Sequence, residues 1–392
     1  MIEAMDFETN FAPATAGEIA VNNLESARQQ SWSRFWEAPL RPGIAECIVE
    51  QEQLTAQFLG DVGVLDRLDA LVNQLARVDP ESGRTALINA QVASMAHRFV
   101  DAKDYLAQAE LHGVFPSSDK PLSLSIDQAC GTNLESVLQA RRRMAAETRR
   151  SEDLVPLGAL LADLCEFEEA DRIYRRALRE YPGVSPFAPA WVCFQLGVLW
   201  GELVPETQSS RAANWYRKAI EYLPGYVKAR VHLAEIYLRC GRAGDAQVLL
   251  VPAVSSGDPE VRWRLADAMR ATGRPAEAEV LMQAAESGFE VLLGKHLLAF
   301  ADHGAEFYSG GGNDAERAFE LASINLANRP TLRAFEQAYV TAVGAGKSNI
   351  ASDILSAAGK RWGNTTAFEL SPLAPVCHHD SLRAKTHKFG HI

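Results

Sequence analysis

The chain has 392 residues, of which 47% are hydrophobic and 23% charged, and its net charge is −11 at pH 7. This is ample apolar material for a sizeable core, and an acidic chain is a poor non-specific ligand for nucleic acid, so we expect no nucleic-acid partner. There is no run of about 18 apolar residues, which argues against a membrane span. The first residues, MIEAMDFETNFAP, lack a basic and apolar targeting pattern, so we expect a cytoplasmic protein.

The N-terminal third of the chain is interpreted as a cap followed by diverged helix pairs. Glu18 to Trp36 is an amphipathic stretch broken by APLRPG, so residues 1–48 are taken as an N-terminal segment with a capping helix. Helix pairs follow from residue 49. Residues 117–150 are degenerate, and the sequence leaves open whether they form a true repeat. Their first residues, SSDKPLS, are expected to form a loop.

The clearest unit lies between Ser151 and Val184. Counted from Ser151, large residues fall at positions 7, 11 and 24, small residues at positions 8, 20 and 27, and proline at position 32. These residues are Leu157, Gly158, Leu161, Ala170, Tyr174, Ala177 and Pro182. Two antiparallel helices can cross closely only where facing residues are small, and a proline ends the second helix. The spacing therefore predicts a helix-turn-helix unit.

This unit has echoes along the chain at spacings near 34 residues. Segments 190–226, 227–258 and 259–288 repeat its small and large positions, although the first has a longer inter-helix turn, GELVPETQSS. The pattern resembles the tetratricopeptide repeat. That resemblance implies an all-α fold, a right-handed α-solenoid of tetratricopeptide-like helix-turn-helix repeats. We expect the solenoid to span residues 49–365, with its clearest repeats at 151–288.

The pattern loosens after residue 288. Two further helix pairs are predicted up to Gly363, and the first of them is joined by YSGGGN. This glycine-rich turn lacks the Lys-Ser/Thr of a phosphate-binding loop and follows no strand, so no nucleotide site is assigned. Residues 366–392 are predicted to form a His-containing tail without regular structure.

The family resemblance places a candidate site on the concave face, which commonly holds an extended peptide or a partner's tail. The predicted groove residues are Trp191, Phe194, Gln195, Lys228, His232, Trp263, Arg264 and Arg270. Exposed aromatic and arginine side chains are typical binding anchors. The alternative is that these aromatic rings pack against neighbouring turns and helices. The family's carboxylate clamp is not matched, because Gln195 and His232 stand where that clamp has asparagine.

The C-terminal tail, VCHHDSLRAKTHKFGHI, gathers residue types that ligate metals. The weak metal candidates are Cys377, His378, His379, His387 and His391. Their spacing fits no standard site, so no cofactor is assigned, and whether the tail binds metal stays open. None of the six cysteines forms a CxxC pair, which favours reduced structural thiols.

No catalytic motif stands out from the helical surface charge, so the chain is predicted not to be an enzyme. The leading hypothesis is a scaffold or adaptor that binds a partner protein or peptide segment in the concave groove. That partner could be an enzyme in a complex. The alternative hypothesis is an accessory subunit of a modifying enzyme or metalloenzyme, with the His-rich tail contributing to a metal site. The sequence names neither the partner and its pathway nor the oligomeric state.

Overall fold

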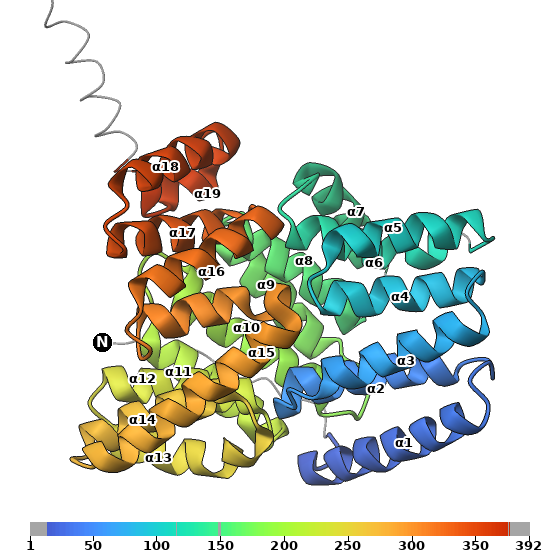
Figure 1. The fold of residues 1–392 in the computed structure, drawn as a ribbon, viewed down its shortest axis with the longest axis horizontal. Helices are drawn as coiled ribbons and strands as arrows, with labels where there is room; N and C mark the ends of the chain where they lie inside the picture. Colours follow the sequence, from blue (N-terminus) through green and yellow to red (C-terminus); the bar gives the residue numbers. More distant parts are fainter. Residues whose placement is uncertain (1–13, 115, 148–149, 375, 377–392) are drawn as a thin grey trace, which may run out of the picture.

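A computed structural model describes residues 14–114, 116–147, 150–374 and 376. Every regular element among these residues is helical, and Figure 1 shows the helices stacked beside one another. None of the described helices is both long enough and apolar enough to cross a bilayer. The predicted all-α fold is therefore confirmed.

The first described element is a single helix, α1 (Gly17–Glu37), and consecutive helix pairs follow it. The first six pairs are α2 (Ile44–Leu59) with α3 (Val64–Val78), α4 (Gly83–Met95) with α5 (Phe99–Leu111), α6 (Pro116–Ala129) with α7 (Leu134–Glu147), α8 (Ser151–Asp163) with α9 (Phe167–Arg179), α10 (Phe187–Val198) with α11 (Ser209–Tyr222), and α12 (Val227–Arg239) with α13 (Ala243–Leu250). The turns inside α10–α11 and after α13 carry two short elements, η1 (Leu199–Leu203) and η2 (Val251–Ser256).

The C-terminal pairs share one long helical element. Helix α14 (Pro259–Ala271) packs on α15 (Pro275–Ser309), which leaves helical geometry at His296 with φ −134° and ψ 53°. The part of α15 after this kink pairs with α16 (Ala315–Asn328). The last elements are α17 (Leu332–Gly344), α18 (Ser348–Trp362) and α19 (Thr366–Leu370). Element α15 is therefore two helices joined at His296, of which the first is the second member of one pair and the second is the first member of the next.

The small residues of the repeat pattern lie where the two helices of a pair cross. A Cβ placed on Gly158 would come 2.6 Å from ring atom Cε1 of Tyr174, so α8 and α9 can approach this closely only with glycine there. Gly197 meets the ring of Tyr216 in the same way between α10 and α11. Ala170 is fully buried against this core. The packing confirms the physical basis of the predicted pattern.

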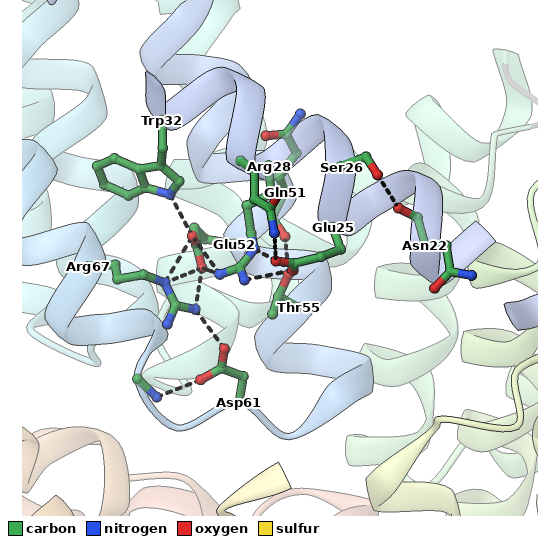
Figure 2. A network of polar contacts seen from close by, with 12 residues as sticks. Asn22, Glu25, Ser26, Arg28, Trp32, Gln51, Glu52, Thr55, Asp61 and Arg67 are labelled. Atoms are coloured by element: carbon green, nitrogen blue, oxygen red, sulfur yellow. Dashed lines mark hydrogen bonds and ion pairs between the residues drawn. The ribbon is translucent and has the colours of Figure 1, made fainter. Parts of the chain in front are cut away.

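A buried carboxylate attaches the capping helix α1 to the first pair. Glu52 of α2 is 0% exposed, and it accepts hydrogen bonds from Trp32 Nε1 at 2.7 Å, Arg67 Nη2 at 2.6 Å and Arg28 Nη1 at 3.3 Å. Figure 2 shows the four side chains converging from α1, α2 and α3. Because the two guanidinium groups and the indole satisfy the buried charge, the network fixes α1 on the solenoid.

Two sequence-based expectations about irregular segments were wrong. The SSDKPLS stretch is helical, because α6 begins at Pro116 and continues through Pro121. The weak unit therefore forms a helix pair, α6–α7. Beyond residue 365, α19 is regular, and Leu373 and Ala374 are buried in the C-terminal core. Apolar residues in this stretch find a core surface to cover, and composition alone did not reveal that.

The solenoid winds tightly enough for successive turns to touch. Phe58 of α2 packs against Phe187 at 5.1 Å and Tyr226 at 4.8 Å between ring centroids, so the first pair rests on the start of α10 and α12. Gly60, which follows α2, lies against Val227. Figure 1 shows the blue N-terminal helices beside the orange α15, and ion pairs join these segments as well. Contacts therefore link parts of the chain that are far apart in the sequence.

Candidate functional site

The predicted groove residues lie on α10, α12 and α14, the first helices of three consecutive pairs. Contacts join Phe194, His232 and Arg264 into one row that crosses from helix to helix. We call the charged groups of this row the charged ladder. It consists of Glu202, His232, Glu235, Glu260, Arg264 and Glu306.

His232 is the cation at one end of the ladder. Its ring lies between Phe194 and Tyr216, with ring centroids 5.1 Å and 5.5 Å away. Its Nδ1 lies 2.7 Å from Glu202 Oε1 and 4.0 Å from Glu235 Oε2. Burial alone would lower the pKa of His232, but the charges of Glu202, Glu235 and Glu260 outweigh it and raise the pKa to about 9. At neutral pH the imidazole is therefore protonated, and Nδ1–H donates to Glu202.

Glu202 reaches this position from a π-helical turn. Helix α10 continues into η1, where the longer inter-helix segment is accommodated and Glu202 is carried past the end of the α-helix. Its Oε1 also accepts a hydrogen bond from the Tyr216 hydroxyl at 2.8 Å. Burial alone would raise the pKa of Glu202, but the charge and hydrogen bond of His232 lower it to about 2. Glu202 and His232 thus form a charged, half-buried pair.

Arg264 is the second cation of the ladder and bridges two carboxylates. Its Nη2 lies 2.5 Å from Glu235 Oε1 and 3.0 Å from Glu306 Oε1, and its Nη1 lies 3.9 Å from Asp267. The side chain is 14% exposed, so these contacts are made in a partly desolvated place. Arg264 therefore ties α14 to both α12 and α15.

The carboxylates of the ladder outnumber its cations. One oxygen each from Glu235, Glu260 and Glu306 lies within 4.8 Å of the other two. Burial raises the pKa of Glu235 and of Glu260, so their negative charges are incompletely compensated. Among the described residues, the Glu260 carboxylate has no ion pair within 4 Å. Arg264 already occupies the space between the other two carboxylates, and the ladder remains acidic.

Trp263, predicted as an exposed anchor, is 4% exposed. Its ring packs edge-on against Phe307 with centroids 5.4 Å apart, and the Arg264 guanidinium covers it at 3.5 Å. The glycine-rich turn closes over it, because a Cβ on Gly311 would come 2.5 Å from Trp263 Nε1. The indole is therefore part of the core between α14 and α15, and only Arg264 is presented at this point of the row.

The other predicted groove residues are placed as follows. Trp191 and Gln195 of α10 and Lys228 of α12 are half-buried, and Trp191 packs against the core around α8 to α12. Arg270 is 52% exposed and lies 3.5 Å from Asp267. The metal candidates of the tail lie outside the described residues. They are Cys377, His378, His379, His387 and His391.

The carboxylates of the ladder were not among the predicted groove residues. Glu235 and Glu260 occupy template positions on the same first helices as His232 and Arg264, whereas Glu202 and Glu306 lie outside the template. Glu202 escapes the repeat template because the π-helical turn shifts its register, and the only signal was the extra length of GELVPETQSS. Glu306 lies on a helix that was predicted as the first of a pair but was not aligned to the template. Both carboxylates are brought to the row by the packing of neighbouring pairs.

Three solved structures show partial likeness to this chain. The APC/C hetero-tetramer Cut9–Hcn1 matches with a TM-score of 0.45 and 13% identity, over 90% of this chain and 66% of that chain, so this chain spans slightly less than two thirds of its length. The C-terminal part of a TPR repeat-containing protein from Cytophaga hutchinsonii matches with a TM-score of 0.31 and 13% identity, over 75% of this chain and 97% of that chain. Yeast Tom70 matches with a TM-score of 0.38 and 12% identity, over 94% of this chain and 96% of that chain.

No family model and no curated protein matches the sequence. The packing of the chain's own helix pairs describes its architecture, with Gly158 against Tyr174 and Gly197 against Tyr216 at equivalent crossings. The chain is a tetratricopeptide-like solenoid. The charged ladder follows the first helices of its pairs.

Proposed function

We propose that this tetratricopeptide-like solenoid is a scaffold that binds a partner protein through its concave face. The segment that it binds is one that carries lysine or arginine. The observation that carries this proposal is the convergence of Glu235, Glu260 and Glu306, with Arg264 between Glu235 and Glu306 and His232 beside Glu235. A rigid row of helices can present such a surface without rearrangement, which reduces the entropy lost on binding.

The electrostatics favour a cationic partner over an acidic one. Burial raises the pKa values of Glu235 and Glu260, so their ionised forms lack the solvation that water would give. An ammonium or guanidinium group placed beside Glu260 would supply a charge-assisted hydrogen bond there. A carboxylate in the same place would be repelled by an already acidic ladder.

Two further parts of the proposal concern chemistry and location. We infer that the scaffold is not itself an enzyme, because the ladder is an ion-pair network without a nucleophile placed beside a base. We also infer a cytoplasmic location, in keeping with the free thiols of the five described cysteines.

Peptide binding tests the proposal. A library of short peptides is screened by fluorescence anisotropy at physiological salt, and the tightest lysine- or arginine-containing binder is measured against the Glu260→Gln variant. We expect Kd to rise about tenfold, which corresponds to about 1.4 kcal/mol for one lost charged contact.

The matched control is Glu279→Gln, which removes an equal charge from an exposed position on the neighbouring helix α15. We expect it to leave Kd within about twofold, because a distant surface charge is screened. If both variants weaken binding equally, the attraction is to the net charge of the chain and the proposed site is wrong. If only acidic or apolar peptides bind, the proposed partner chemistry is wrong.

A further inference from the structure

The winding of the solenoid brings the kink of α15 against α3, across about 230 residues of sequence. Lys295 Nζ lies 2.6 Å from Asp66 Oδ2, and His296 Nε2 lies 3.0 Å from Asp66 Oδ1. His296 Nδ1 lies 3.9 Å from Asp69 Oδ2. We call these four residues, Asp66, Asp69, Lys295 and His296, the latch.

The rest of this seam combines polar contacts with the packing of Gly131 against the Trp362 ring and of Leu134 against the C-terminal core. His97 Nδ1 lies 3.2 Å from the Leu298 carbonyl oxygen, and the Asn328 side chain donates to the His97 carbonyl oxygen at 3.0 Å. Further along, Arg361 donates to the Gly131 carbonyl oxygen at 2.9 Å. These contacts join α15, α16 and α18 to the turns that follow α4 and α6.

Apolar burial at the latch is small. Among the described residues, the buried cluster there consists of Leu65, Ala96 and Ala299, with the partly buried Met95 and Phe300 packed against it. The neighbouring seam, where α1 and α2 meet α9 to α12, is different, because Leu24 and Phe58 belong to a large buried core. Burial of apolar surface is the main driving force of such contacts, so the seam at the latch is the weaker of the two.

The Lys295–Asp66 ion pair of the latch is accessible to solvent and salt, whereas the His296 side chain is 7% exposed. Lys295 is 53% exposed and Asp66 is 47% exposed, and ion pairs of this kind are weak and strongly screened. Both sides of the seam are also turn regions. His296 has non-helical φ and ψ values, and His97 adopts φ +55° at the turn between α4 and α5. Separation of the seam therefore requires no helix to break.

We propose that the latch holds the superhelix closed, and that its release lets the C-terminal helix pairs swing away from α3 and α4. Helix α14 moves with them, because Phe307 after the kink is packed on Trp263 of α14. The proposal of a latch is independent of the function proposed above, and its test uses the chain without any binding partner. Solenoids suit such a movement, since each repeat contacts mainly its neighbours.

The test combines carbodiimide cross-linking with small-angle scattering on the full chain. Carbodiimide joins an amine to a carboxylate in contact, so we expect a Lys295–Asp66 cross-link at low salt. The internal control is the Lys218–Glu221 pair, three residues apart on α11 and 2.8 Å between Nζ and Oε2. At 1 M NaCl we expect the latch cross-link to fall by about tenfold relative to this control.

Scattering then distinguishes opening from loss of contact. We expect the radius of gyration to rise at 1 M NaCl by about a tenth of the roughly 21 Å of a compact chain of this length. Lys295→Glu should give the same increase already at low salt. Arg274→Glu makes an equal charge change in the Arg274–Glu277 pair at the start of α15, and it should leave the radius of gyration unchanged.

Two results would overturn the proposal. One is a latch cross-link that persists in high salt as well as the control does. The other is a cross-link that is lost while the radius of gyration of both the wild type in high salt and the Lys295→Glu variant stays at the low-salt value. In either case the seam is closed by contacts other than the latch, and the peptide-binding experiment is unaffected.

Discussion

The Glu202→Gln substitution should move the titration of His232 toward lower pH. In the wild type, Glu202 lies 2.7 Å from His232 Nδ1, and the pKa of His232 is raised to about 9. Burial lowers that pKa, so the rise depends on the nearby carboxylates, of which Glu202 is the closest. With Glu235 and Glu260 left in place, we expect the pKa of His232 to fall by at least about one unit.

The same interaction sets a pH dependence of stability. The difference between about 9 and the ordinary 6.5 corresponds to about 3 kcal/mol at 1.4 kcal/mol per pKa unit. His232 is 23% exposed, so solvent screening should leave about 1–2 kcal/mol. Because folding raises the pKa of His232, this stabilisation is fully present below pH 6.5 and is lost as pH rises through about 9.

Glu202 is the other member of this pair, and its protonation sets the low-pH limit of the stabilisation. Folding lowers the pKa of Glu202 from 4.5 to about 2, so its stabilisation is present above pH 4.5 and is lost as pH falls toward 2. The pair is therefore most stabilising between pH 4.5 and pH 6.5. It is one interaction seen from two groups, and its free energy is counted once.

Two measurements check this prediction. Histidine-ring NMR gives the pKa of His232 directly, with the resonance assigned from its absence in His232→Gln. Thermal midpoints of the wild type and Glu202→Gln, followed from about pH 6 to about pH 10, should converge as His232 loses its proton. The reasoning is refuted if His232 titrates near 6.5 in the wild type, or if the two midpoints keep a constant difference across that range.

Three further predictions concern packing and buried charge. Gly311→Ala should cost about 1–3 kcal/mol, because its Cβ would meet the indole at 2.5 Å, and should lower the thermal midpoint. Gly244→Ala has open space on α13 and should be neutral or slightly stabilising. Glu52→Gln should cost about 1–3 kcal/mol, because Arg28 and Arg67 lose their buried carboxylate but keep Glu25 and Asp61 as partners. Glu50→Gln on the exposed side of the same helix should change stability by less than about 0.5 kcal/mol. Limited proteolysis should then cut α1 first in the Glu52 variant, and intact α1 would argue against the network. Phe58→Ala should cost about 3–5 kcal/mol and loosen the contact of α2 with α10 and α12, which urea denaturation can measure.

The helix pairs could be predicted because their pattern is local. Gly158 and Tyr174 must face each other for α8 and α9 to cross, so both residue types are visible at fixed spacing in the sequence. The same logic held for Gly197 and Tyr216. The charged positions His232 and Arg264 were also predicted, since template positions on a first helix indicate which side chains point away from the second.

The burial of Trp263 was predicted only as the alternative to an exposed anchor, and the closure of the superhelix was not predicted. Trp263 is covered by Phe307 and by the turn at Gly311, more than forty residues later in the chain. The latch joins Asp66 to Lys295, and a repeat pattern does not indicate which residues meet between superhelical turns. The burial of Trp263 depends on the packing of the adjacent helix α15, whereas the latch depends on the accumulated curvature of many pairs, which no single repeat specifies.

A charge exchange across the interface tests the central claim most directly. Glu260→Lys is combined with a version of the tightest cationic peptide in which one lysine or arginine at a time is replaced by glutamate, and each pairing is measured by fluorescence anisotropy. We predict that each single change weakens binding and that one peptide position restores affinity with the Glu260→Lys protein, to within about tenfold of the original pair. If the losses of binding free energy from the protein change and the peptide change simply add at every position, Glu260 does not contact the partner. The charged ladder is then not the binding site.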